Sequence, residues 1–419
     1  MMKLIAVLQI TCVLLLEHAH GSDWMADYKK GLQLQKAIHG LQKFPEKPQI
    51  RLGEHEVLKC QDMDPSPKDP SSVHRVKPAD IKVIAALGDS ITAGAGINAS
   101  RIQDLPIENR ELSWSAGGYG TYADIITLPN ILKLFNPDLI GYAQGSTIFG
   151  QPASLQNTGL NLAVSGANTF ELPEQTRKLI DTMKKYPGVN FQKDWKVVTI
   201  FIGGNDLCGY CKNKELFSSD NYIHNMTASL DMLHRELPRA IVNVVQIFWM
   251  EHLRKIDDGS DGCQLQKQFC SCLLTPADGS AELQELLNQN ALFQIKLEKL
   301  IGSGRYDKKN NFAVVLQPFL KKALPPQKSD GSIDYSYFSV DCFHFGIKGQ
   351  EQLALGLWNN MVQPENEKFK FEIFSNPVKI LCPSQLHPYL YTRKSLASLA
   401  LNGSYSIILL IFILELGFW

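Results

Sequence analysis

The fold of this chain is decided by residues 83–94, which read VIAALGDSITAG. An apolar run ends abruptly at Gly88, and Asp89, Ser90 and small residues follow. This pattern predicts a buried strand, a tight turn and the start of a helix. It places the Ser90 hydroxyl at the carboxyl end of a strand, where open α/β sheets bind their ligands. A serine there is a nucleophile if a base reaches it, whereas the plainer alternative is that Ser90 caps the helix.

Two other stretches favour the nucleophile. Residues 195–202 (WKVVTIFI) form another strand-like run, and GGND follows at 203–206. Near the C-terminus, Asp341 stands three residues before His344, ahead of a helix-like segment. An Asp at that spacing can hold one nitrogen of the imidazole while the other nitrogen meets a serine, which fixes the tautomer and orientation of the ring. The chain therefore offers a nucleophile, an orienting carboxylate and a base.

Together these motifs resemble those of the GDSL or SGNH hydrolases, from about residue 82 to about residue 360. Four marker residues are typical of that family: a Ser in Gly-Asp-Ser, a Gly, an Asn in Gly-x-Asn-Asp and a His in Asp-x-x-His. The matching residues here are Ser90, Gly166, Asn205 and His344.

Within the family, three segments are similar to a single repeat of membrane-associated phospholipase B, namely residues 86–94, 201–208 and 341–345. The chain departs from the family pattern at Ile91, where the family name implies Leu, but the change is apolar for apolar. It also has room for one repeat where that phospholipase has several.

The resemblance implies a three-layer α/β/α sandwich and ester hydrolysis through an acyl-enzyme, with no metal or other cofactor. His344 takes the proton of Ser90 as it attacks, and Asp341 orients the imidazole. The backbone N–H groups of Ser90 and Gly166 and the side-chain amide of Asn205 are the candidate oxyanion donors. The alternative for Gly166 is that the fold needs it for a close backbone approach.

We also expect Asp89 and Asp206 to fix turns by accepting backbone N–H groups.

By the same resemblance, the substrates are fatty-acyl esters of phospholipids and lysophospholipids, met at a membrane or micelle surface, with an extracellular or apical plasma membrane location. Two alternatives remain open. One is a carbohydrate or small-ester deacetylase of the same fold, and the other is a catalytically silent lipid-binding module. Headgroup and positional preference and the oligomeric state stay open at this point.

Composition limits the other function classes. The chain has 419 residues, of which 44% are hydrophobic and 20% are charged, which is typical of a globular protein with a large core. Lys plus Arg equals Asp plus Glu at 42 each, so the chain lacks the basic excess of a nucleic-acid-binding domain.

Strands and helices alternate along the chain, which predicts a parallel sheet of about five strands covered by helices on both faces. Besides the run before Ser90, the strand-like runs are 160–164, 195–202, 240–248 and 312–316, and the helix-like runs are 122–135, 172–186, 220–237 and 281–302. A polar insertion at 254–280 is either a disulfide-pinned cover over the cleft or a surface elaboration with no part in catalysis.

The sequence pattern at each end of the chain predicts a segment that serves processing or membrane anchoring. An apolar run after Lys3, followed by small residues, predicts a secretory signal peptide rather than a membrane anchor, because the run is too short to span a bilayer. The apolar end is either a removable lipid-anchor signal or a plain tail. The expected order is a signal peptide at 1–21, a helical segment and Pro-rich linker at 22–80, the hydrolase domain at 81–363, an extension at 364–404 and the tail at 405–419.

Eight cysteines remain once the predicted signal peptide is removed, and an oxidising compartment favours disulfides among them. Eight cysteines allow about a hundred pairings, and the sequence does not choose among them. Zinc at Cys208, Cys211, Cys270 and Cys272 is the alternative, although their spacing is not that of a zinc finger. The N-glycosylation pattern occurs at Asn98, Asn225 and Asn402.

Overall fold

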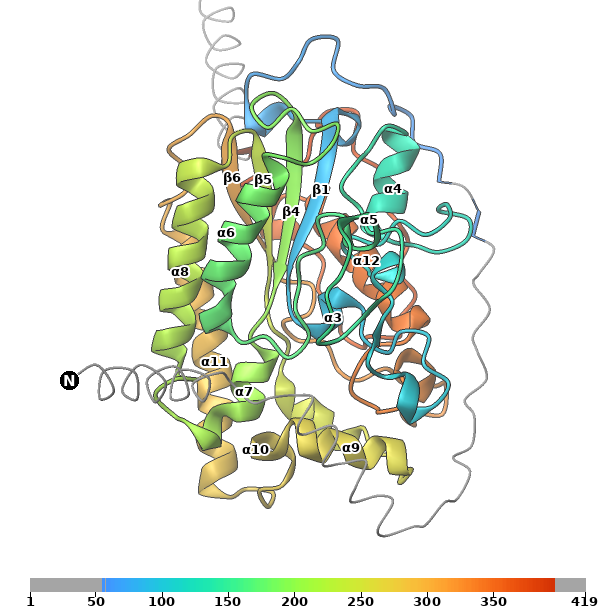
Figure 1. Cartoon of the computed structure of the whole chain (residues 1–419), viewed down its shortest axis with the longest axis vertical. Coiled ribbons are helices and arrows are strands. Elements are labelled where there is room, and N and C mark those ends of the chain that lie inside the picture. The colour runs from blue at the N-terminus through green and yellow to red at the C-terminus, as the bar shows by residue number, and fades with distance from the viewer. Residues whose placement is uncertain (1–54, 57, 396–419) are drawn as a thin grey trace, which may run out of the picture.

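The computed structural model describes residues 55–56 and 58–395 (Figure 1). The predicted signal peptide, the rest of the chain before residue 55, the apolar tail and Asn402 lie outside the described residues. No helix within the described part of the chain has the length and hydropathy needed to cross a bilayer.

Four parallel strands form the central sheet in the order β1, β4, β5, β6, which confirms the predicted parallel architecture. Nearly every side chain in them is buried, because helices cover both faces of a parallel sheet. This is why the strands read as continuous apolar runs in the sequence. Their bounds are Ile81–Gly88 (β1), Trp195–Phe201 (β4), Ala240–Val245 (β5) and Phe312–Gln317 (β6).

One of the five predicted strands, residues 160–164, is not a regular strand. It runs parallel to β1 with a single bridge between Asn161 and Ala86, and the N–H of Val164 donates to the carbonyl of Gly88. Two glycines in left-handed conformations, Gly159 (φ 53°) and Gly166 (φ 79°), bound the segment closely and leave few residues for pairing. It therefore lies beside β1 as an irregular extended segment.

Two groups of helices flank the sheet, which confirms the α/β/α layers. Helices α6 (Leu172–Met183) and α11 (Ala281–Gly302) both contact α8 (Ser219–Glu236), and α4 (Leu128–Phe135) contacts α12 (Ile347–Met361). Figure 1 shows α6 and α8 together on one side of the strands and α4 and α12 together on the other.

Helix α4 begins six residues later than the predicted start at residue 122. The side chain of Thr127 caps it by accepting the N–H of Asn130, and Pro129 stands in its first turn. The remaining helices and strands are short: α3 (Ser90–Ala93), α5 (Leu155–Thr158), α7 (Gly204–Gly209), α9 (Asp261–Phe269), α10 (Ser271–Leu274), and the antiparallel pair β2 (Ile107–Glu108) and β3 (Thr147–Ile148).

The insertion folds into α9 and α10, and disulfides tie it to the rest of the domain. Cys208 and Cys211, in and directly after α7, pair with Cys270 and Cys272, so these four sulfurs form disulfides instead of the alternative zinc site. Cys263 of α9 pairs with Cys342, and Cys60 pairs with Cys382. All eight cysteines outside the predicted signal peptide are thus paired.

Candidate active site

Ser90 is the first residue of α3, directly after the carboxyl end of β1. The residue that caps α3 is Asp89, whose side chain accepts the N–H of Ile91 at 3.0 Å, so the alternative that Ser90 is the cap is wrong. Gly88 turns the chain with φ 152°, and a Cβ there would lie 2.3 Å from the carbonyl oxygen of Phe201. The tight turn leaves the Ser90 hydroxyl available for a partner from elsewhere in the chain.

That partner is His344, which the fold brings to the same edge of the sheet from 254 residues away. Its Nε2 lies 2.8 Å from Ser90 Oγ, and its Nδ1 lies 2.6 Å from Asp341 Oδ2. The other oxygen of Asp341 accepts the backbone N–H groups of Phe343 and His344, which fixes the carboxylate beside Nδ1. The three side chains form one chain of hydrogen bonds, in which His344 Nε2 is placed to accept the hydroxyl proton while Asp341 holds Nδ1.

Burial and charge act in opposite directions on Asp341. Its complete burial favours the neutral acid, but the charge of His344 and the hydrogen bonds from the His344 ring and backbone outweigh burial and hold the pKa of Asp341 below its usual range. Asp341 is therefore ionised at neutral pH. An ionised carboxylate stabilises the imidazolium that forms when His344 takes a proton.

Asn205 and Gly166 flank this hydrogen-bonded chain. Asn205 lies in α7, directly after β4, and Gly166 follows the extended segment on the other side of β1. The side-chain amide of Asn205 donates to the carbonyl of Ala167 at 2.9 Å, so the two flanks meet beyond the end of β1. An amide carries two N–H bonds, and this contact orients the second one. Four segments thus deliver the four predicted marker residues to one edge of the sheet.

Asp89 and Asp206 are both buried, and each accepts backbone N–H groups, as the sequence predicted. Asp206 accepts the N–H and the hydroxyl of Thr169, which joins α7 to the chain after Gly166. Burial raises the pKa of Asp89 to about 7 and that of Asp206 to about 6, against the hydrogen bonds that lower them.

A buried ion pair supports the Gly166 side of the site, and sequence reasoning missed it. Arg110 donates to Glu108 at 2.7 Å and to the carbonyls of Asn161 and Ala163, and Glu108 accepts the Ser165 hydroxyl at 2.6 Å. The signal was weak because the partners are far apart in the sequence. The local feature that could have indicated it is the close spacing of two opposite charges, Glu108 at the end of β2 and Arg110 two residues later.

Helix α9 reaches the other side of the site. The Phe269 ring lies 6.2 Å from that of Phe343 and 6.5 Å from the His344 imidazole, and the Cys263–Cys342 disulfide joins α9 to the loop between Asp341 and His344. Ser90 is 3% exposed and His344 is 1% exposed. The sequence left two interpretations of the 254–280 insertion, a disulfide-pinned cover over the cleft and a surface elaboration with no part in catalysis. These contacts favour the first.

Comparison with known proteins gives one family and several relatives. The family model of GDSL-like lipases and acylhydrolases matches residues 84–357. Phospholipase B1, membrane-associated, from Homo sapiens is 43% identical over 379 residues, which cover 89% of this chain and 25% of that protein. The Mus musculus protein of the same name is 42% identical over 351 residues, covering 83% and 24%. The chain spans about a quarter of the length of these relatives.

Among solved structures, an acetyl esterase crystallised with an acetate ion aligns with 66% of this chain and 94% of its own length, at 14% identity and a TM-score of 0.32.

Proposed function

This chain belongs to the GDSL-like lipase and acylhydrolase family, and we propose that it is a serine esterase that hydrolyses fatty-acyl esters of phospholipids and lysophospholipids. The observation that carries the proposal is the chain of hydrogen bonds from Ser90 through His344 to Asp341. The names of the relatives support the lipid substrate, since they are phospholipases.

In the proposed mechanism, His344 Nε2 takes the proton of Ser90 as Oγ attacks the ester carbonyl. His344 then gives the proton to the departing alcohol, and water hydrolyses the acyl-enzyme by the same route in reverse. Asp341 keeps Nδ1 protonated and stabilises the imidazolium. The backbone N–H groups of Ser90 and Gly166 and the amide of Asn205 stabilise the oxyanion, a contribution worth about 3 kcal/mol per donor in other hydrolases.

We further propose that the protein works in the secretory pathway or outside the cell, associated with a membrane surface. Four disulfides support an oxidising compartment. Asn98 is exposed, as a glycosylated residue must be, whereas Asn225 is half-buried and its amide donates to the carbonyl of Asn221.

The test combines a covalent probe with a substrate panel. A fluorophosphonate should label the purified protein, and Ser90→Ala should abolish labelling while the circular dichroism spectrum stays that of the folded chain. Detergent-dispersed phosphatidylcholine and lysophosphatidylcholine should then release fatty acid. Hydrolysis of acetylated sugars without release from lipids would instead indicate the deacetylase, and folded protein that takes no label would indicate the silent module.

A further inference from the structure

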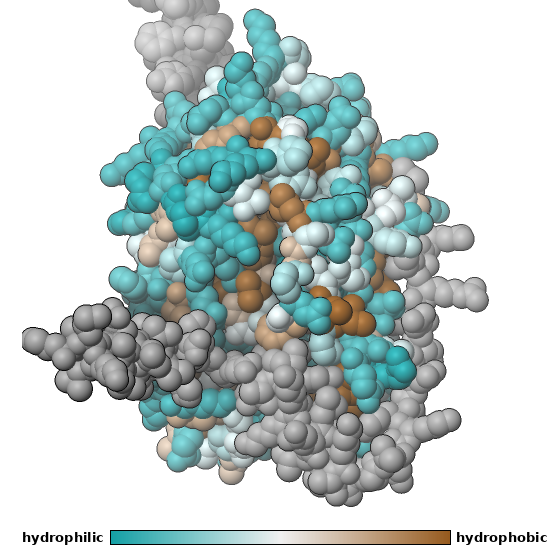
Figure 2. All heavy atoms as spheres, viewed as in Figure 1, coloured by the Kyte–Doolittle hydropathy of each residue, from teal (hydrophilic) through white to brown (hydrophobic). Residues whose placement is uncertain are grey.

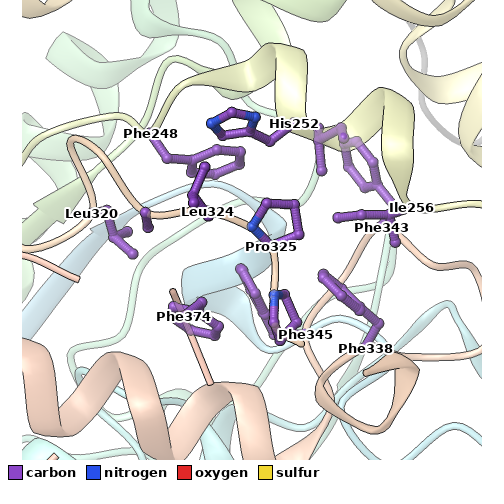
Figure 3. Close-up of a pocket in the computed structure, with 13 residues that line it drawn as sticks. Phe248, His252, Ile256, Leu320, Leu324, Pro325, Phe338, Phe343, Phe345 and Phe374 are labelled. Atoms are coloured by element: carbon purple, nitrogen blue, oxygen red, sulfur yellow. The ribbon is translucent and has the colours of Figure 1, made fainter. Parts of the chain in front are cut away.

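An apolar cavity lies beside the loop that carries His344 (Figure 3). Its empty space, counted out to the open solvent at its mouth, is about 440 Å³. Five phenylalanines line it together with leucines, prolines and other apolar side chains, and Figure 3 shows them pointing toward a common centre. The five are Phe248, Phe338, Phe343, Phe345 and Phe374.

The walls of the cavity come from the same edge of the sheet as the active site. Phe248 follows β5, and Leu320 follows β6. The lower wall in Figure 3 is a row of packed rings, with 5.6 Å between the centroids of Phe338 and Phe345 and 5.3 Å between those of Phe345 and Phe374. Rings packed in this way give the cavity a fixed shape before any ligand enters.

Phe343 connects the cavity to the reacting groups. It stands next to His344 in the chain, its ring centroid is 5.2 Å from that of the imidazole, and the same ring lines the cavity. His252 also lines the cavity, and its Nδ1 is buried without a hydrogen-bond partner. Burial and nearby Lys255 hold the pKa of His252 below its usual value, so the ring is neutral at pH 7 and adds no charge to the cavity.

We propose that this cavity binds the fatty-acyl chain of the substrate, with Phe343 as the part of its wall that lies next to His344. The inference rests on the proposed function and adds the place where the chain lies. Walls that are almost wholly apolar gain affinity from methylene groups and offer a sugar few hydrogen-bond partners. Each methylene buried there should strengthen binding about fourfold, so affinity should rise steeply with chain length.

The test fills the mouth of the cavity. Leu324 lines it and is 38% exposed, so Leu324→Trp should narrow the cavity while leaving the buried core unchanged. Leu292→Trp is the matched control, because Leu292 is 37% exposed on α11 and does not line the cavity. Leu324→Asp is a second variant, which places a charge at the mouth without added bulk.

Two measurements separate the cavity from the chemistry. The first is the kcat/KM for p-nitrophenyl esters from acetate to decanoate, and the second is the Kd for the fluorescent fatty acid cis-parinaric acid, which needs no catalysis. Both Leu324 variants should lose at least tenfold in kcat/KM for decanoate and in parinarate affinity, with kcat/KM for acetate within twofold. The Leu292 variant should match the parent protein in all of these.

Several outcomes would overturn the inference. Equal losses on acetate and decanoate would show a general structural defect, and unchanged decanoate hydrolysis in both Leu324 variants would show that the chain lies elsewhere. In the second case the proposed function survives if phosphatidylcholine is still hydrolysed. The parent protein could also bind parinarate but hydrolyse no lipid ester. If the Leu324 variants then lose parinarate binding, the cavity is a fatty-acid site and the proposed function is wrong. Apolar peptides that displace parinarate more strongly than fatty acids do would indicate a protein partner as the occupant.

Discussion

The two sides of Ser90 are held in place by different kinds of interaction. On one side, the segment that leads to Gly166 is held beside β1 by hydrogen bonds from the buried Arg110 to the carbonyls of Asn161 and Ala163. On the other side, α9 and α10 are held by disulfides to α7, to the residues directly after it and to the loop that carries His344. We call these the polar side and the disulfide side.

The difference indicates a division of labour. Several short hydrogen bonds fix a backbone N–H to within a fraction of an ångström, which a candidate oxyanion donor requires. A disulfide limits how far two segments separate but lets the rest of each segment move. Because Ser90 and His344 are almost fully buried, substrate entry needs some movement of what covers them. We therefore expect the polar side to govern the rate of the chemical step and the disulfide side to govern access and stability.

The largest expected effect on kcat comes from Asp341, which lies on neither the polar side nor the disulfide side. Asp341→Asn leaves an uncharged partner at His344 Nδ1 and favours the wrong tautomer, so kcat should fall by about 10⁴-fold with a free energy of unfolding changed by about 1 kcal/mol. Ester hydrolysis and urea unfolding measure the two quantities. Asp334→Asn is the control, because Asp334 pairs with Lys348 outside the catalytic chain, and its kcat should stay within twofold. Equal kcat values for the two variants would remove Asp341 from the mechanism.

The next prediction tests the polar side. Arg110→Met leaves Glu108 buried without its cationic partner and removes two hydrogen bonds to the 161–163 backbone, so the free energy of unfolding should fall by about 3 to 5 kcal/mol. In protein that remains folded, kcat should fall at least tenfold, because Gly166 is no longer held in position.

Its matched control is Arg305→Met, which breaks an exposed ion pair with Asp231 and should cost about 1 kcal/mol or less, with no change in kcat. If Arg110→Met lost stability but kept its full kcat, the polar side would be a structural support alone, and the proposed division of labour would be wrong there.

The same contrast separates what the sequence could predict from what it could not. The strands were predictable because burial on both faces makes each one a continuous apolar run, and the catalytic motifs follow two of them directly. Segment 160–164 was mistaken for a regular strand because its short apolar run does not show that it pairs through a single bridge.

Contacts between residues far apart in the chain could not be predicted from the sequence. Arg110 meets carbonyls 51 and 53 residues away, and Cys208 meets Cys270 across 62 residues, so neither leaves a local pattern. The helices α9 and α10 are short and are held by disulfides to distant residues, which is why the sequence predicts an insertion without secondary structure there. Local patterns therefore predicted the residues of the candidate active site, whereas the contacts of the polar side and the disulfide side could be identified only in the folded chain.

The disulfide side is tested by replacing Cys263 and Cys342 with Ala together. The free energy of unfolding should fall by about 2 to 4 kcal/mol, because the unfolded chain is no longer cross-linked. With α9 released from the His344 loop, kcat/KM for a bulky phospholipid should change relative to that for p-nitrophenyl acetate. The control removes the Cys60–Cys382 bond, which does not touch α9 or the His344 loop and should lower stability without changing that ratio. Equal ratios in both double variants would refute a role in access.

The smallest predicted effect concerns Asp206, which joins the two sides. It stands in α7 next to Asn205, and its carboxylate accepts the N–H and hydroxyl of Thr169, which follows Gly166. Burial raises its pKa from 3.8 to about 6. Between pH 4 and 6 the folded chain therefore holds a proton that the unfolded chain has released. The Asp206 carboxyl therefore makes its full contribution to the free energy of unfolding below pH 4. This contribution falls by about 1 kcal/mol per pH unit as the pH rises toward 6 and changes little above pH 6.

Asp206→Asn removes this titration but leaves that of Asp89, whose pKa is raised to about 7, so the stability of the variant should decline less steeply than that of the parent and exceed the parent trend by about 2 kcal/mol over the interval. Urea unfolding at pH 4.5, 5.5, 6.5 and 7.5 measures the slopes, and Asp138→Asn, whose side chain is 85% exposed, should keep the parent slope. A parent slope in the Asp206 variant would mean that another group titrates. A reduced slope with an unchanged kcat would show that the contact between Asp206 and Thr169 serves the fold, whereas a lower kcat would show that the position of Asn205 depends on that contact.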